Sequence, residues 1–258
     1  MDELLRIMAR LRDPVSGCPW DLEQTLTSLA PYTLEEAYEV VDAIERGDLA
    51  ALEEELGDLL LQVAFQSQVA AEQGRFDFDA VARGIAAKML RRHPHVFGTE
   101  RIATAAAQTA RWEDLKAAER AATGKGASLM DDVPRALPAL TRGAKLGRRA
   151  ARIGFDWPDA TGARSKVDEE LSELDAAIAS RAQHDIEHEL GDALLALTNL
   201  ARHLAVDPEA ALRAANRRFE TRFRHVERRA GDSGDRAPAE LERYWEEAKQ
   251  VERGPATP

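Results

Sequence analysis

Apolar residues recur every three or four positions along most of this chain, and charged residues occupy the positions between them. This period is typical of amphipathic helices, whereas sustained alternation of β-branched residues, typical of strands, is almost absent. The sequence therefore predicts an all-α protein. The expected helices of the first half cover about residues 2–12, 33–46 and 49–73, with a third long helix that ends before Pro94, and those of the second half cover about 136–152, 165–181, 183–205 and 208–230.

Five acidic residues occur twice at one constant offset. Glu35, Glu36, Glu39, Glu55 and Asp58 each have an identical acid 134 positions later, namely Glu169, Glu170, Glu173, Glu189 and Asp192. A five-point pattern that repeats without slippage indicates a duplicated unit. We therefore expect two tandem helical bundles, over residues 1–122 and 135–258, joined by a linker at 123–134 that contains Gly, Lys and Pro.

Helical spacing explains why these acids belong together. Within each copy the first three share one side of a helix, and the last two share a face of the next helix. Apolar residues take the opposite sides, so face-to-face packing of the two helices would bring the acidic stripes together. These apolar residues are Leu34, Tyr38 and Val41 on the first helix and Leu56, Leu59, Leu60 and Val63 on the second. Thr33 and Glu36 have the spacing of a capping box, which predicts a helix start there.

Clustered carboxylates repel one another and raise one another's pKa unless a cation neutralises them. Hard divalent cations that prefer oxygen ligands suit such a cluster, with Mg²⁺ first and Mn²⁺ as the alternative. A solvated acidic helix face would account for one copy equally well. Two superimposable copies favour the metal site.

The composition narrows the class of protein. The formal net charge of −11 argues against broad nucleic-acid binding. Cys18 is the only cysteine, which excludes an intramolecular disulfide, and no segment has the length or apolarity of a membrane span or a signal peptide core. We expect a cytoplasmic protein with no membrane partner.

Basic residues in the second half indicate which kind of ligand would bind beside the metal. Arg218 and Arg222 lie one helical turn apart, and Lys249 follows Trp245 by one turn. Arginine forks beside a metal are a usual way to hold a polyphosphate, and an indole can stack on a base. The alternatives are that the arginines pair with surface acids and that Trp245 anchors a core.

A short zinc-protease pattern, H-x-x-E-H, occurs at residues 184–188. Its counterpart in the first copy contains no histidine, while Glu189 and Asp192 beside it do recur. We therefore interpret His184 and His188 as exposed or adjacent to substrate.

The motifs E-E-x-x-E and E-x-x-D, present as EEAYE…ELGD and as EELSE…ELGD, resemble those of the MazG-type nucleoside triphosphate pyrophosphohydrolases. Further similar stretches are CPWDLEQT, PYTLEEAYEV, GRFDF, RRHPHVFG, KVDEE, NLARHL and WEEAKQVE, so the resemblance covers nearly the whole chain. It implies Mg²⁺-dependent hydrolysis of nucleoside triphosphates, ATP among them, to the monophosphate and pyrophosphate, in nucleotide-pool housekeeping. It also implies a homodimer.

The resemblance assigns roles by position. Glu170, Glu173, Glu189 and Asp192 would be metal ligands, as would Glu36, Glu39, Glu55 and Asp58 in the weaker N-terminal copy, and Glu169 would position or deprotonate water. Lys166, Arg218, Arg222 and Lys249 would hold phosphates, and Trp245 would lie beside the nucleoside.

The two copies differ where the substrate would bind. Tyr32 stands at the position of Lys166, and Gly84 at that of Arg218. We therefore expect the C-terminal copy to be catalytic, and the N-terminal copy to bind metal but turn over poorly. Two other functions remain open at this stage: a pyrophosphatase restricted to a few nucleotides, and a metal-dependent nucleotide-sensing or interaction scaffold without turnover.

Overall fold

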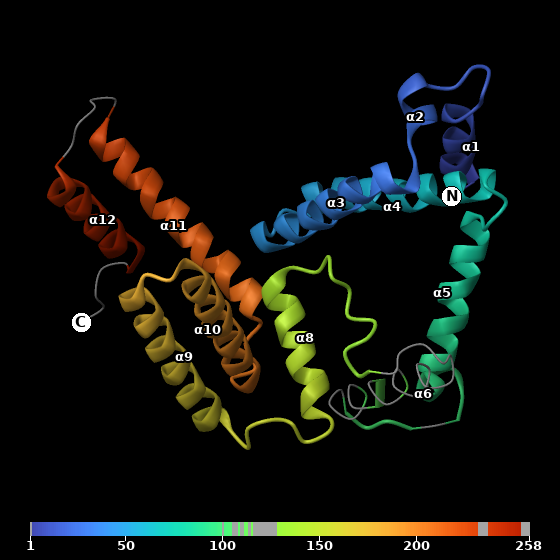
Figure 1. Cartoon of the computed structure of the whole chain (residues 1–258). Coiled ribbons are helices and arrows are strands. Elements are labelled where there is room, and N and C mark those ends of the chain that lie inside the picture. The colour runs from blue at the N-terminus through green and yellow to red at the C-terminus, as the bar shows by residue number, and fades with distance from the viewer. Residues whose placement is uncertain are drawn as a thin grey trace. The chain divides into compact units, whose positions relative to one another are not determined.

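The computed structural model describes residues 2–99, 101–104, 108, 111–112, 115, 128–231 and 237–253. All regular elements in this part of the chain are helices, so the prediction of an all-α protein is confirmed (Figure 1). The chain divides into two compact units, Met1–Ala117 and Ala118–Pro258. The limits of the predicted linker, of which residues 123–127 lie outside the described residues, stay a prediction.

The N-terminal unit is built on an antiparallel pair of long helices, α3 (Leu26–Arg46) and α4 (Leu49–Glu72). Gly47 ends α3 in the left-handed region, with φ of 70°, and the side chain of Asp48 accepts from the backbone N–H of Ala51 to cap α4. Because glycine adopts positive φ without a steric cost, the chain can reverse within two residues. These two residues therefore fix the hairpin that faces the two acidic stripes toward each other.

The start of α3 differs from the prediction. Its capping box is formed by Thr25 and Ser28, not by Thr33 and Glu36, and Pro31 lies inside the helix. Thr33 instead donates from its hydroxyl to the carbonyl of Leu29 within the helix. The upstream cap and the complete burial of Leu29 stabilise the additional turns despite the backbone hydrogen bond that Pro31 removes.

Shorter helices complete this unit. α1 (Asp2–Leu11) packs on α4, α2 (Pro19–Glu23) lies in the connection to α3, and α5 (Phe78–Arg92) and α6 (Pro94–Phe97) follow α4. A buried cluster joins α1, α3 and α4: Met8, Leu29, Phe65 and Val69.

The C-terminal unit repeats this plan. α9 (Ala160–Ser180) and α10 (Gln183–His203) form the long pair, and α8 (Ala139–Ala151) packs on α10 as α1 packs on α4. α11 (Pro208–Ala230) and α12 (Pro238–Arg253) form a second antiparallel pair. The bounds of α8 to α11 agree with the predicted helices to within a few residues.

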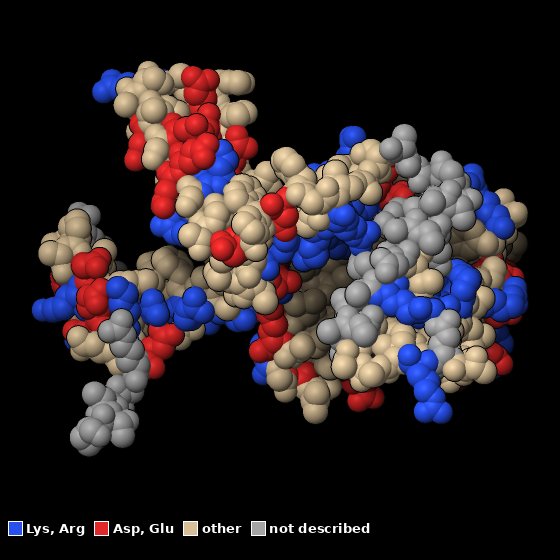
Figure 2. All heavy atoms as spheres, turned by 90° about the horizontal axis from the view of Figure 1, so that it is seen from below, with Lys and Arg blue, Asp and Glu red and all other residues tan. Residues whose placement is uncertain are grey.

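The apolar stripe of α3 and α4 is not the packed interface that the sequence suggested. Leu34, Tyr38 and Leu56 are about half exposed, at 48%, 49% and 49%, and Leu60 and Val63 are each 37% exposed. Periodicity identifies an apolar face but cannot say whether the same chain covers it. Figure 2 shows residues without charge lying between acidic and basic side chains on the face in view.

Across the described residues, none of the helices combines the length and the apolarity needed to cross a bilayer.

Candidate active site

The carboxylates of the C-terminal unit meet between α9 and α10. Glu170 and Glu173 on α9 and Glu189 on α10 each offer an oxygen, and these oxygens lie within 4.8 Å of one another. Glu170 is buried, with 6% of its surface exposed, whereas Glu173 is exposed. The structure therefore brings together three of the predicted metal ligands from two helices.

Lys166 lies one turn before the acids on α9 and contacts two of them. Its Nζ lies 2.7 Å from Glu169 Oε1 and 2.8 Å from Glu170 Oε1. Hydrogen bonds with Glu169 and then Glu170 raise the pKa of Lys166 above its usual range, so the ammonium is fully charged at neutral pH. It supplies the positive charge that the buried carboxylate of Glu170 requires.

The cluster still carries excess negative charge. Desolvation, followed by repulsion from Glu170 and Glu189, raises the pKa of Glu173. Carboxylate oxygens at this density, drawn from the two helices of a hairpin, form the kind of donor set that hard divalent cations prefer. The residues present therefore fit a bound divalent cation.

Asp192 belongs to an adjoining group that includes a residue missed at the sequence level. His188 Nδ1 lies 3.3 Å from Glu189 Oε1 and 3.3 Å from Asp192 Oδ2. Its side chain is 65% exposed, in agreement with the interpretation of an exposed histidine. Its spacing of four residues from Asp192 was the signal that it could join the acids.

The N-terminal unit has a matching acidic group. Glu36 on α3 and Glu55 and Asp58 on α4 offer ligand atoms within 4.8 Å of one another. Desolvation, then repulsion from Asp58 and Glu39, raises the pKa of Glu36, and desolvation, then repulsion from Glu39, raises that of Glu55. Convergence of the acidic stripes, expected from helical spacing, is found in both units.

The predicted phosphate-binding residues of α11 and α12 lie on one helical pair, with acidic partners of their own. The guanidinium of Arg222 contacts Glu252 Oε2 at 2.6 and 2.7 Å and lies 5.7 Å from the ring centre of Trp245. Lys249 Nζ lies 2.6 Å from Glu246 Oε1. Arg218 is exposed and makes no ion pair within the described part of the chain. A phosphate would have to compete with these acids.

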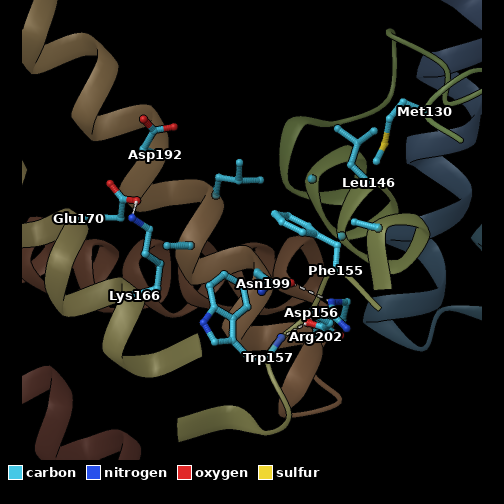
Figure 3. A pocket seen from close by; sticks show the side chains of 15 residues that line it. Met130, Leu146, Phe155, Asp156, Trp157, Lys166, Glu170, Asp192, Asn199 and Arg202 are labelled. Carbon is cyan, nitrogen blue, oxygen red and sulfur yellow. Dashed lines mark hydrogen bonds and ion pairs between the residues drawn. The ribbon is translucent and has the colours of Figure 1, made fainter. Parts of the chain in front are cut away.

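A cavity of about 270 Å³ opens beside Lys166, Glu170 and Asp192 (Figure 3). Its other walls come from α8, from residues 155–157 and from the C-terminal half of α10. Figure 3 shows Lys166 and Glu170 at one side of this space and Leu146 and Phe155 at the other. No motif in the sequence indicated this cavity.

Asp156, in the wall of the cavity, is held by two residues near the end of α10. Its Oδ1 accepts hydrogen bonds from Arg202 and, at 2.9 Å, from His203. The hydrogen bond from Arg202 is the main cause that lowers the pKa of Asp156 to about 2; burial opposes it, and the hydrogen bond from His203 adds to the lowering. This contact ties the segment before α9 to the end of α10.

We expect Asp156→Asn to lower the free energy of unfolding by about 1–3 kcal/mol at pH 7, because hydrogen bonds to a charged group are lost. A carboxyl group whose pKa is lower in the folded than in the unfolded state stabilises the fold at pH values above its unfolded pKa. This stability is lost as the pH falls through the folded pKa. The difference from wild type in urea unfolding should therefore shrink between pH 3.8 and about 2. A difference that stays constant over this range would mean that the charge of Asp156 contributes nothing.

The chain is similar to known proteins over nearly its whole length. The family described as "MazG nucleotide pyrophosphohydrolase domain" matches residues 24–97 and, a second time, residues 161–227, which confirms the tandem repeat. The nucleoside triphosphate pyrophosphohydrolase of Escherichia coli K12 is 49% identical over 98% of this chain and 97% of its own length. A Thermotoga maritima protein named nucleoside triphosphate pyrophosphohydrolase/pyrophosphatase MazG is 42% identical over 96% of this chain and 95% of its own. A Mycolicibacterium smegmatis nucleoside triphosphate pyrophosphohydrolase is 37% identical over 84% of this chain and 61% of its own.

Proposed function

The chain belongs to the MazG nucleotide pyrophosphohydrolase family, and from this premise we propose that its C-terminal unit carries the reaction. The enzyme is a hydrolase of acid anhydrides that converts a nucleoside triphosphate and water to the monophosphate and pyrophosphate. The observation that carries the choice of unit is the contact of Lys166 with Glu169 and Glu170, because Tyr32 replaces the lysine in the other unit.

The proposed cofactor is Mg²⁺, with Mn²⁺ as the alternative, held by Glu170, Glu173, Glu189 and Asp192. When bound, the cation neutralises phosphate charge and lowers the pKa of water. The three carboxylates that lie within 4.8 Å of one another support this ligand set. The raised pKa of Glu173 agrees with a site that lacks positive charge without its ion.

In the proposed reaction, a water oxygen bonds to the α-phosphorus in line with the bond to the bridging oxygen. That bond breaks, and pyrophosphate leaves with the bridging oxygen and its electron pair. Glu169 would position the water and accept its proton, because its carboxylate is 56% exposed and oriented by Lys166. Lys166 would hold a phosphate oxygen.

Arg218, Arg222 and Lys249 are proposed to bind the phosphates, with Trp245 at the edge of the nucleoside. Arg222 and Lys249 exchange the acids Glu252 and Glu246 for phosphate oxygens in this proposal. Guanidinium forks suit that exchange because they can bind phosphate with two parallel hydrogen bonds.

The N-terminal unit is proposed to bind a divalent cation without efficient turnover. Its acids Glu36, Glu39, Glu55 and Asp58 include three with ligand atoms in reach of one ion. It has no lysine at the position of Lys166, and Gly84 stands where Arg218 stands in the other unit.

The reaction is tested by incubating the purified chain with a panel of ribo- and deoxyribonucleoside triphosphates, with and without Mg²⁺ or Mn²⁺. We expect nucleoside monophosphate and pyrophosphate in equal amounts, only when a divalent cation is present. Orthophosphate as the product would mean cleavage between the β- and γ-phosphates and would contradict the mechanism. Binding without any product would favour the nucleotide-sensing scaffold, and a short list of accepted bases would favour the narrower enzyme.

The proposed role is nucleotide-pool housekeeping in the cytoplasm, where nucleoside triphosphates are found. We also propose a homodimer, because the apolar stripe of α3 and α4 described above is exposed among the described residues of the N-terminal unit. An exposed apolar surface of this kind marks an association site.

Leu60→Glu is expected to shift the dimer to monomer, because it would bury an unpaired charge in the interface. Sedimentation velocity over a range of concentrations measures the change. The control is Ala50→Glu, which adds the same charge on the same helix at an exposed residue that lies on another side of the helix from the stripe. A wild-type chain that sediments as a monomer at every concentration would contradict the proposal.

A further inference from the structure

The cavity beside the carboxylates has two chemically different sides. Lys166, Glu170 and Asp192 bring charge to one side, Phe155 lies at the other, and the ring of Trp157 lies between Lys166 and Phe155 in the view of Figure 3. Its volume of about 270 Å³ is close to the lower end of the range for small-molecule sites. An occupant would therefore have a flat apolar part joined to a phosphorylated part.

Asn199 supplies a fixed hydrogen-bond donor in the wall. Its Oδ1 accepts from Arg202 Nε at 2.8 Å, and since arginine can only donate, the amide NH₂ must point the other way. Arg202 is held in turn by Asp156. Within the described residues, Arg202 is the only hydrogen-bond partner of the Asn199 side chain, so its NH₂ is available to a ligand.

Close packing of glycines shapes the walls. A Cβ at Gly147 of α8 would lie 3.0 Å from Asn199 Oδ1, and one at Gly143 would lie 3.2 Å from Leu195 Cδ1. At Gly162, in the first turn of α9, a Cβ would lie 2.4 Å from Trp157 Cδ1. These glycines let α8 approach α10 and let the indole of Trp157 lie against α9. The positions of the cavity walls are therefore set by defined contacts.

The N-terminal unit has a buried aromatic ring at the position equivalent to Asn199. Phe65 stands at the position of Asn199 and is only 3% exposed. Trp20 packs against it and against Tyr32, with ring centres 6.4 and 5.9 Å apart. The N-terminal unit, which has Tyr32 at the position of Lys166, thus also has a buried ring at the position of Asn199. Both differences separate it from the unit that is proposed to be catalytic.

We propose that this cavity receives the nucleobase of the triphosphate, with the Asn199 amide donating to an acceptor atom on the base edge. The inference rests on the proposed function and specifies where its substrate binds. It separates the base from Trp245, which does not line the cavity. Every nucleobase carries acceptor atoms on its edge, so one amide donor suits a site that accepts several bases.

The first test fills the cavity. Ala150 lines it from α8, and Ala139 on the same helix is exposed and lies outside it. We expect Ala150→Phe to raise KM for nucleoside triphosphates about 10- to 100-fold, and Ala139→Phe to leave it unchanged. Ribose 5′-triphosphate, which lacks a base, should be hydrolysed equally by both variants and the wild type.

Equal losses with ribose 5′-triphosphate and with the nucleotides would overturn the assignment, since the cavity would then serve the phosphates or the fold. Loss of base dependence in Trp245→Ala, with Ala150→Phe unaffected, would place the base at Trp245 and also overturn it. A wild-type chain inactive on every triphosphate is a different result, because the proposed function would then fail. Calorimetric binding of nucleoside monophosphates to Ala150→Phe would still report on the cavity.

The second test changes the donor alone. Asn199→Asp keeps an oxygen for Arg202 but replaces the amide NH₂ by an acceptor. Bases with a carbonyl at C4 of a pyrimidine or C6 of a purine should lose activity, and bases with an amino group there should gain it, so kcat/KM for UTP relative to CTP, or for GTP relative to ATP, should fall about tenfold. Unchanged ratios for both pairs would exclude Asn199 from base recognition.

Discussion

Glu189→Gln is expected to lower kcat by about a thousandfold or more, because it removes the charge of a proposed metal ligand that would act in the transition state. Glu189 lies where the carboxylates of α9 and α10 converge and offers a ligand atom in both acidic groups there. Glutamine has nearly the same shape, so the fold should persist. Pyrophosphate release under saturating nucleotide measures the effect.

The matched control is Glu55→Gln, the same substitution at the equivalent position of the N-terminal unit. We expect turnover to stay within about twofold of wild type, because that unit has Tyr32 and Phe65 where the other has Lys166 and Asn199. If Glu55→Gln abolished turnover and Glu189→Gln left it intact, the catalytic unit would be the N-terminal one.

Lys166→Met is expected to lower kcat/KM about 100-fold or more, because this one cation contacts the acids and is proposed to hold the substrate. The ammonium contacts Glu169, the proposed water-positioning residue, and the buried Glu170. Methionine retains the length of the side chain but not the charge. Steady-state kinetics with one nucleotide, together with a thermal unfolding curve, measures the loss and checks the fold.

Lys145→Met serves as the control for charge. Lys145 is exposed on α8 of the same unit and outside the cavity lining. Full activity of Lys166→Met would contradict its role in phosphate binding, and an equal loss in Lys145→Met would mean that net charge alone is responsible.

Most of the fold could be predicted from local signals. Glycine and proline residues such as Gly47 and Pro94 delimit helices whose apolar period is regular, so the predicted bounds came close to those observed. The start of α3 was wrong because Pro31 lies inside the helix, where a proline is a poor but not a forbidden residue. The apolar stripe was misassigned because periodicity does not distinguish a core from an interface.

The candidate site also has a part that could be predicted from the sequence and a part that could not. The acids could be predicted because the duplication showed which of many charged residues share one arrangement. The cavity could not, because Ala150, Trp157 and Asn199 come from three separate segments that the fold brings together. His188 was interpreted as exposed or adjacent to substrate, and its contact with Asp192 was not predicted because the histidine has no counterpart in the first unit.

The buried Phe65 also indicates how a duplicated enzyme divides its tasks. An open cavity sacrifices packing that the fold could otherwise use, and catalytic sites are commonly destabilising for this reason. If the C-terminal copy alone performs the chemistry, as proposed, selection does not maintain an opening in the other copy, and a large apolar ring can enter its core. The N-terminal unit would then contribute thermodynamic robustness to a polypeptide whose other half retains the cost of catalysis.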